Sequence, residues 1–160
     1  MEMETNVNIG IDTKSREKIA AGLSKFLADS YTLYLQTHYF HWNVTGPMFH
    51  QLHLMFETQY TELAAAVDVI AERIRSIGHR APGTFNEFLK LSCIVETKSL
   101  PVANEMINIL LQSNEAVVRS AREVLAISEK ESDQATSDLV TQRINLHEKT
   151  SWMLRSFLEN

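Results

Sequence analysis

The sequence predicts an all-α protein: a four-helix bundle with a short extra helix in the long connection between the second and third helices. Only 5 of the 160 residues are glycine and 3 are proline, too few for a turn-rich all-β fold. Between these few residues run long segments with the periodicity of amphipathic helices. A chain of 160 residues is expected to be a single domain that buries its own core.

Four segments have the length and periodicity of bundle helices, namely 13–44, 48–77, 101–128 and 132–158. Pro101 is expected in the first turn of the third helix and Ser132 as the N-cap of the fourth. The second segment has the clearest apolar stripe, with residues spaced by three and four: Phe49, Leu52, Phe56, Tyr60, Leu63, Val67, Ile70, Ile74 and Ile77. The predicted core faces of the last two are Met106, Leu110, Val117 and Val124, and Leu139, Leu146, Met153 and Phe157.

The connections predict how the helices run. The short turn at Gly46 and Pro47 makes the first two helices antiparallel neighbours. The link 78–100 is long enough to run the length of the bundle, so the second and third helices are expected to be parallel. Within this link, the short extra helix is expected around four apolar residues: Phe85, Phe88, Leu89 and Leu91.

Composition and charge exclude several classes of protein. The formal net charge of −5 is unlike that of a generic nucleic-acid binder. The sequence has no apolar run of about 18 residues, so we expect no membrane span, and its N-terminus lacks the apolar core of a targeting peptide. Cys93 is the only cysteine, which predicts a reducing cytoplasm, and it is expected to be a small buried hydrophobe. Residues 1–12 are expected to form a short flexible acidic tail.

Two pairs of polar residues flank the apolar stripe of the second helix. His53 and Glu57 are four residues apart, as are Asp68 and Glu72, so each pair lies on one helix face. The pairs are separated by 15 residues from His53 to Asp68, or roughly 22 Å along the helix. They therefore cannot form one site within one chain.

A second copy of the helix brings the two pairs together. The midpoint between His53 and Glu72 is also the midpoint between Glu57 and Asp68. A two-fold axis at this point creates two identical sites that combine imidazole and carboxylate groups. His41, near the end of the first helix, is expected to reach the same end as His53. Such nitrogen and oxygen ligands, without thiolate, suit iron better than structural zinc.

Other interpretations of these residues remain open. Asp68 and Glu72 are equally compatible with a solvated face, with Arg73 and Arg75 as ion-pair partners. His38 is expected to support His41 rather than to bind metal. Of the remaining candidates, three histidines are expected as caps or surface groups and two tryptophans as core or interface aromatics: His50, His79, His147, Trp42 and Trp152.

The motifs around these residues resemble those of one family. The stretch from Thr37 to Phe49 (THYFHWNVTGPMF), followed by His53 and Glu57, resembles the Dps proteins, the mini-ferritins named as DNA-binding proteins from starved cells. The stretches 68–73 (DVIAER) and 147–153 (HEKTSWM) are similar to later parts of that family's sequence. The resemblance covers nearly the whole chain, and Glu57 stands where many relatives have aspartate.

The resemblance implies a fold, a site and an activity. The fold is a ferritin-like four-helix bundle, a single domain over 1–160, and twelve subunits form a hollow shell. A di-iron ferroxidase site lies at each two-fold subunit interface, where iron is held by His41, His53 and Glu57 of one subunit and Asp68 and Glu72 of the other. Members oxidise Fe(II), usually with hydrogen peroxide in preference to oxygen, and store the ferric mineral, which protects against oxidative stress.

Two further features are interpreted with the resemblance in view. Glu131, Asp133 and Asp138 near the start of the last helix either line an acidic pore that admits iron or match the helix dipole, and both interpretations stay open. Trp42, adjacent to His41, is either a sacrificial electron donor or a packing residue.

DNA binding is the alternative function that the family name suggests: a nucleoid-associated protective protein with secondary iron chemistry. Residues 1–13 contain three acidic residues and no lysine or arginine, unlike the basic tails of DNA-binding relatives. Twelve chains at −5 each would carry −60, which repels phosphate. We therefore predict no appreciable DNA binding.

Overall fold

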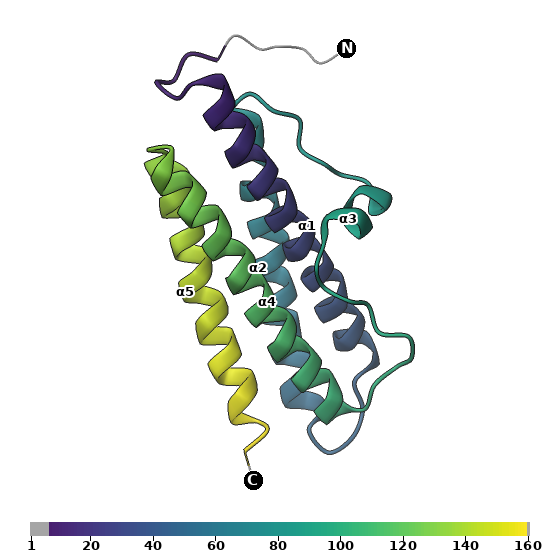
Figure 1. Cartoon of the computed structure of the whole chain (residues 1–160). Coiled ribbons are helices and arrows are strands. Elements are labelled where there is room, and N and C mark those ends of the chain that lie inside the picture. Colours follow the sequence, from purple (N-terminus) through teal and green to yellow (C-terminus); the bar gives the residue numbers. More distant parts are fainter. Residues whose placement is uncertain (1–6, 160) are drawn as a thin grey trace.

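A computed structural model describes residues 7–159, and the described residues form five helices and no strand. Four long helices make the bundle: α1 (Thr13–Asn43), α2 (Phe49–Ser76), α4 (Ala103–Lys130) and α5 (Gln134–Ser156). The short helix α3 (Phe85–Leu91) lies in the crossover between α2 and α4 (Figure 1). The predicted all-α bundle with an extra short helix is confirmed.

The directions of the helices agree with the lengths of their connections. In Figure 1 the chain runs down α1 and up α2, crosses beside α1 through α3, and then runs up α4 and down α5. Thus α1 and α2 are antiparallel, whereas α2 and α4 are parallel. The crossover is held against α1 in part by Tyr31, whose ring stacks on Phe88 with a centroid distance of 4.9 Å.

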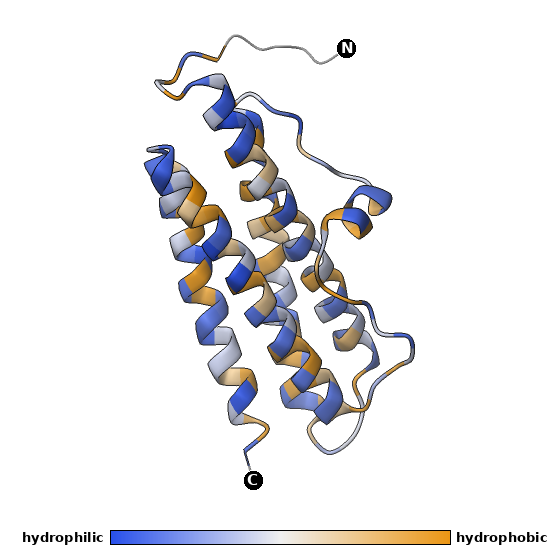
Figure 2. Ribbon diagram, in the orientation of Figure 1, coloured by the Kyte–Doolittle hydropathy of each residue, from blue (hydrophilic) through white to orange (hydrophobic). Residues whose placement is uncertain are grey.

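The core is formed by the apolar faces of the long helices, which Figure 2 shows as orange stripes among polar residues. Phe26, Phe40 and Phe56 are fully buried there. Most of the predicted stripe of α2 is buried or half-buried, but Phe49, at its start, is 44% exposed. The four residues predicted for the third helix are all buried: Met106, Leu110, Val117 and Val124.

The core face predicted for the last helix is only partly confirmed: Leu139 packs half-buried against the core and Leu146 is half-buried. Met153 and Phe157 are 41% and 37% exposed, while Val140, Ile144 and Leu154 are buried instead. The pattern of apolar residues misleads here because the buried face of α5 is partly polar: Thr136, Arg143, His147 and Ser151.

Two predicted helix starts also shift. Helix α4 begins at Ala103, so Pro101 precedes it instead of lying in its first turn. The N-cap of α5 is Asp133 rather than Ser132, and Ser132 has a left-handed backbone with φ of 58°. At the other end of the chain, the predicted acidic tail 1–12 lies outside the described residues up to residue 6. Its last residue, Asp12, is the N-cap of α1 and accepts a hydrogen bond from the backbone N–H of Ser15.

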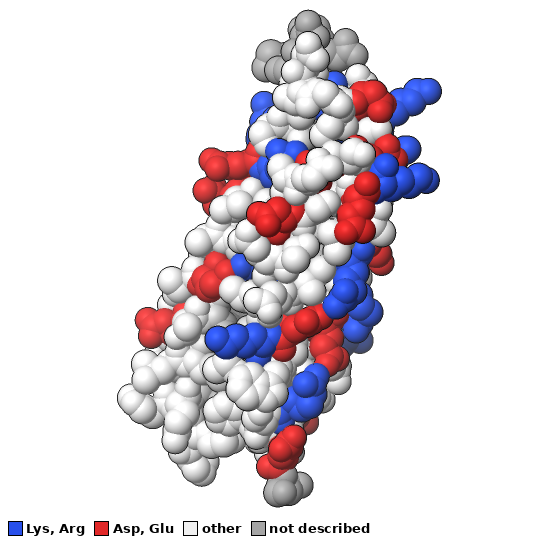
Figure 3. Space-filling view, turned by 90° about the vertical axis from the view of Figure 1, so that its left-hand side faces the viewer, with Lys and Arg blue, Asp and Glu red and all other residues white. Residues whose placement is uncertain are grey.

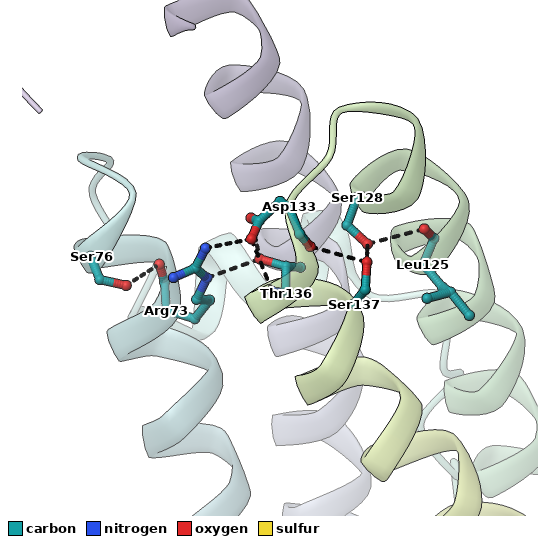
Figure 4. A network of polar contacts seen from close by, with 7 residues as sticks. All are labelled: Arg73, Ser76, Leu125, Ser128, Asp133, Thr136 and Ser137. Carbon is teal, nitrogen blue, oxygen red and sulfur yellow. Dashed lines mark hydrogen bonds and ion pairs between the residues drawn. The ribbon is translucent and has the colours of Figure 1, made fainter. Parts of the chain in front are cut away.

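A polar network ties the C-terminal end of α2 to the start of α5 (Figure 4). Arg73 donates to Asp133 Oδ1 at 2.7 Å and to Thr136 Oγ1 at 2.9 Å, and the backbone N–H of Thr136 donates to the same Asp133 oxygen. Burial acts against ionisation of Asp133, but the hydrogen bonds from Arg73 and Thr136 outweigh it and lower the pKa of this carboxyl. Asp133 therefore serves as both helix cap and ion-pair partner.

The helices in the described part of the chain are too short or too polar to cross a membrane.

Candidate metal centre

Two histidines from neighbouring helices face each other near the α1–α2 turn. His41 Nδ1 lies 2.8 Å from the carbonyl oxygen of His53, and His53 Nδ1 lies 2.9 Å from the carbonyl oxygen of His41. Because a carbonyl only accepts, each Nδ1 carries a hydrogen and donates it. The Nε2 atom of each neutral ring then carries the lone pair that a metal ion uses.

The same geometry fixes the orientation of the two rings. The His41 and His53 rings stack with a centroid distance of 3.8 Å and an interplanar angle of 17°. His41 is buried and His53 is half-buried, and Glu57 follows one turn later on the exposed surface of α2. These three residues form one half of the candidate centre.

The other half lies toward the opposite end of the same helix. Asp68 and Glu72 are one helical turn apart and both are exposed. Within the described residues, no group of three or more histidine, cysteine or acidic side chains is close enough to hold a metal ion. A single chain thus carries two separate groups of candidate ligands, and neither is a complete site.

The arginines expected to neutralise Asp68 and Glu72 are engaged elsewhere. Arg73 pairs with Asp133, and Arg75 donates to the carbonyl oxygen of His79 at 2.9 Å. Among the described residues, no ion pair includes Asp68 or Glu72. The ion pairs with Arg73 and Arg75 that the alternative interpretation expects are therefore not formed in the described chain, whereas the exposure of Asp68 and Glu72 agrees with a solvated face.

Aromatic rings surround the histidine half. The His38 ring stacks on Tyr60 with a centroid distance of 4.0 Å. The ring of Trp42, which is also in α1, lies at the same centroid distance from His38. Tyr60 also meets His41 edge-on at 5.0 Å. The sequence does not indicate this position of Tyr60, because its spacing places it in the core stripe of α2. Trp42 is 59% exposed, so it is no core residue of this chain. Burial, together with the nearby His41, lowers the pKa of His38.

His147 is not the surface group that the sequence predicts. Its side chain is 1% exposed, its Nδ1 donates to Asn114 Oδ1 at 2.8 Å, and its Nε2 accepts from Arg143 at 3.0 Å. Burial, and then the positive charge of Arg143, lowers the pKa of His147 to about 3. Arg143 also forms an ion pair with Glu62. Both ring nitrogens of His147 are thus occupied, and no lone pair is left for a metal ion.

The three acidic residues near the start of α5 have different surroundings. Asp133 is buried in its cap and ion pair, and Glu131 is paired with Lys18 at 2.9 Å. Asp138 is exposed and accepts a hydrogen bond from Gln142. The structure favours a capping role for Asp133, and lining of a pore for iron remains a prediction for Glu131 and Asp138.

Comparison with known proteins extends this description. The family model for the ferritin-like domain matches residues 20–160. The DNA protection during starvation protein 2 of Bacillus anthracis is 38% identical over 136 residues, which cover 85% of this chain and 93% of that protein. An uncharacterised low temperature-induced protein of Nostoc is also 38% identical, over 155 residues, covering 96% of this chain and 87% of the relative.

Solved structures agree with these sequence matches. A Dps protein from Vibrio cholerae O1, described as a member of a broad superfamily of ferritin-like diiron-carboxylate proteins, has a TM-score of 0.92 and 32% identity over 98% of both chains. A Dps protein from Bacillus brevis has a TM-score of 0.89 and 33% identity, covering 93% of this chain and all of the other. The chain belongs to the Dps family of ferritin-like proteins.

Proposed function

We propose that this protein is a ferroxidase that oxidises Fe(II), with hydrogen peroxide as the preferred oxidant, and stores the ferric product in a hollow shell of identical subunits. Its membership of the Dps family supports a role in iron storage and protection. The observation that carries the proposal is the pair of reciprocal hydrogen bonds between His41 and His53, which leaves both Nε2 lone pairs for metal. The proposed shell has twelve subunits and lies in the cytoplasm.

The proposed iron site is shared between two chains. One subunit supplies His41, His53 and Glu57. These ligands face Asp68 of the partner subunit and Glu72 of the partner subunit. The incomplete ligand groups at opposite ends of α2 support this arrangement, since a two-fold axis midway along the helix completes both at once. Imidazole nitrogen and carboxylate oxygen together accommodate both ferrous and ferric iron.

Small side chains along α2 favour a close approach of the two helices. Thr61, Ala64 and Ala65 lie between the two ligand pairs, and all three are exposed in the single chain. A second copy of α2 can approach closely over such residues, and the distance between the imidazole and carboxylate groups then becomes short enough for one site. Glu57 reaches one methylene further than the aspartate of many relatives, which alters the spacing of the irons.

The oxidation balances with two iron ions as substrates. Each Fe(II) gives one electron, and the O–O bond of hydrogen peroxide takes both electrons and two protons to yield two water molecules. Because both electrons reach the same peroxide molecule, no hydroxyl radical is released. The histidines and carboxylates hold the two ions together, so both electrons are available at one place.

Ferric absorbance after anaerobic loading with Fe(II) tests the proposal. We expect a fast rise with hydrogen peroxide, at about one peroxide per two irons, and a slower rise with oxygen. The variants His53→Ala and Asp68→Ala should each lose the fast rise. His50→Ala, which removes an exposed histidine from the same helix, should keep it. If the protein accelerates oxidation no more than buffer does with either oxidant, the proposal is wrong.

A further inference from the structure

Asp29 is a fully buried carboxylate in the middle of α1. Its Oδ1 atom accepts two hydrogen bonds from the crossover, one from the hydroxyl of Ser92 at 2.9 Å and one from the backbone N–H of Cys93 at 2.7 Å. The other oxygen, Oδ2, is buried without a hydrogen-bond partner among the described residues. A buried carboxylate oxygen without a donor is costly, so it indicates a specific role.

Cys93 lies next to the buried Asp29 and is itself exposed to solvent. The sequence predicts a buried thiol, but Cys93 is exposed, because it follows directly after the end of α3 where the crossover turns along the bundle surface. Its own backbone N–H binds Asp29, which brings the negative charge close to the sulfur. Small oxidants in solution can therefore reach a sulfur that lies beside a buried carboxylate.

The charges around the sulfur oppose formation of a thiolate. Burial of part of the side chain and the negative charge of Asp29 both raise the pKa of Cys93. Lys25, one turn before Asp29, acts in the opposite direction, but its ammonium group is paired with Glu123 of α4 at 2.7 Å. The net effect on the sulfur is the retention of its proton.

We propose that Asp29 keeps Cys93 in its thiol form and so protects this exposed sulfur from oxidation by peroxide. Oxidation begins when a thiolate attacks one oxygen of hydrogen peroxide and breaks the O–O bond, giving a sulfenic acid and hydroxide. The sulfur loses two electrons and the peroxide gains them. A neutral thiol is a poor nucleophile in this step, so an ionised Asp29 slows it.

The value of this protection rests on the proposed function, because a ferroxidase that uses peroxide meets its oxidant continually. Peroxide that oxidises the protein's own thiol is no longer available for the oxidation of iron. Further oxidation of Cys93 to a sulfinic acid would also place a second negative charge beside that of the buried Asp29. The resulting repulsion would act on the contact that holds the crossover to α1.

The test compares wild-type protein with Asp29→Asn in the metal-free state, so its outcome is independent of ferroxidase activity. The rate of alkylation of Cys93 by iodoacetamide is followed by mass spectrometry from about pH 7 to about pH 10. In Asp29→Asn the midpoint of the rate curve should move to lower pH. The reaction at neutral pH should then be about threefold faster per unit of displacement, because the larger thiolate fraction outweighs the weaker nucleophilicity of a more acidic thiol. Sulfenic acid formed by hydrogen peroxide and trapped with dimedone should increase in parallel.

Glu96→Gln is the matched control, since it removes a charge from an exposed residue of the same segment and should leave the curve in place. An unchanged curve in Asp29→Asn overturns the proposal. So does a higher plateau with an unchanged midpoint, because that result means that Asp29 only restricts access to the sulfur. If Asp29→Asn does not fold, the thiolate absorbance of the wild-type protein decides: a midpoint at or below about pH 8.5, the value of a free cysteine, contradicts the proposal.

Discussion

His147 makes folding sensitive to acid through a single residue. In the folded chain its pKa is lowered to about 3, first by burial and then by Arg143, whereas its ordinary value is 6.5. Between these two pH values the unfolded chain binds more protons than the folded one. The contribution of His147 to the free energy of unfolding is therefore complete above pH 6.5. It is lost as the pH falls toward 3, by at most about 1.4 kcal/mol per pH unit.

Denaturant unfolding at a series of pH values measures this contribution. The variant His147→Gln has no imidazole to protonate, so its free energy of unfolding should fall less steeply below pH 6.5 than that of the wild type. The exposed histidine His50 provides the control, and His50→Gln should retain the wild-type slope. Equal slopes for His147→Gln and the wild type would contradict this account of the network.

Asp133 combines two stabilising roles in one carboxylate. Replacement by alanine removes the cap of α5 and leaves the partly buried Arg73 without its partner. We expect the free energy of unfolding to fall by about 2 to 4 kcal/mol. Asp138→Ala, at an exposed position five residues later within α5, should change it by less than about 0.5 kcal/mol. Similar losses in the two variants would mean that the network in Figure 4 contributes little.

The end of α2 depends on a glycine. Gly78 has φ of 93°, and a Cβ atom there would lie 2.8 Å from Arg16 Nη1 and 2.9 Å from Val7 Cγ2. Arg16 is itself held by the carbonyl oxygen of Ile77. Gly78→Ala should therefore lower the melting temperature, at a cost of about 1 to 3 kcal/mol. Gly83→Ala, where a Cβ meets nothing within 4 Å, should melt close to the wild type. A lower melting temperature for Gly83→Ala than for Gly78→Ala would show that close contacts do not restrict position 78.

At the level of helices, the sequence predicts the bundle well and one helix face poorly. Sparse glycine and proline locate the turns, and the stripe of α2 is regular because apolar residues alone face the core there. Helix α5 departs from this rule, since His147 and Arg143 are buried through hydrogen bonds that no periodicity of apolar residues reveals. Cys93 is misjudged for a similar reason: the polar partner that holds its backbone, Asp29, is 64 residues away in the sequence.

The candidate metal centre could be predicted only in part. Helical spacing pairs His53 with Glu57 and Asp68 with Glu72, but spacing does not reveal the mutual hydrogen bonds of His41 and His53. These bonds join two helices, so they depend on how the helices pack. The contribution of a partner subunit stays a prediction, which the symmetry of residue positions along α2 supports.

The whole molecule has one face that suits assembly. Figure 3 looks onto the side that carries α5, where charged residues run down the right-hand edge, further acidic groups lie over the upper and middle left, and an uncharged area covers the lower left. Between α2 and α5 lies a cavity of about 510 Å³, where apolar side chains alternate with polar ones such as Gln59 and Glu62. Leu54, Met153 and Phe157 line it and are each more than a third exposed. Apolar surface of this extent is typical of a face that another molecule covers, which supports the proposed homo-oligomer.

The charge of the whole molecule predicts its behaviour toward DNA. At −5 per chain, an assembly of identical subunits repels the phosphate backbone more strongly as it grows. We expect no mobility shift of duplex DNA in a gel at physiological salt, although relatives are named for DNA protection. A tight complex under these conditions would overturn this prediction and favour the nucleoid-associated alternative.

Co-assembly of two inactive variants tests the central claim, that each iron site is shared between two chains. His53→Ala lacks a ligand in one half of the site and Asp68→Ala lacks one in the other. Equal amounts of the two variants are unfolded together and then refolded. A shared site is intact only where its His53 comes from an Asp68→Ala chain and its Asp68 comes from a His53→Ala chain. Random pairing predicts about a quarter of wild-type ferroxidase activity, since each position is intact in about half of the chains. If mass spectrometry shows mixed oligomers and the mixture is as inactive as either variant alone, the site is not shared.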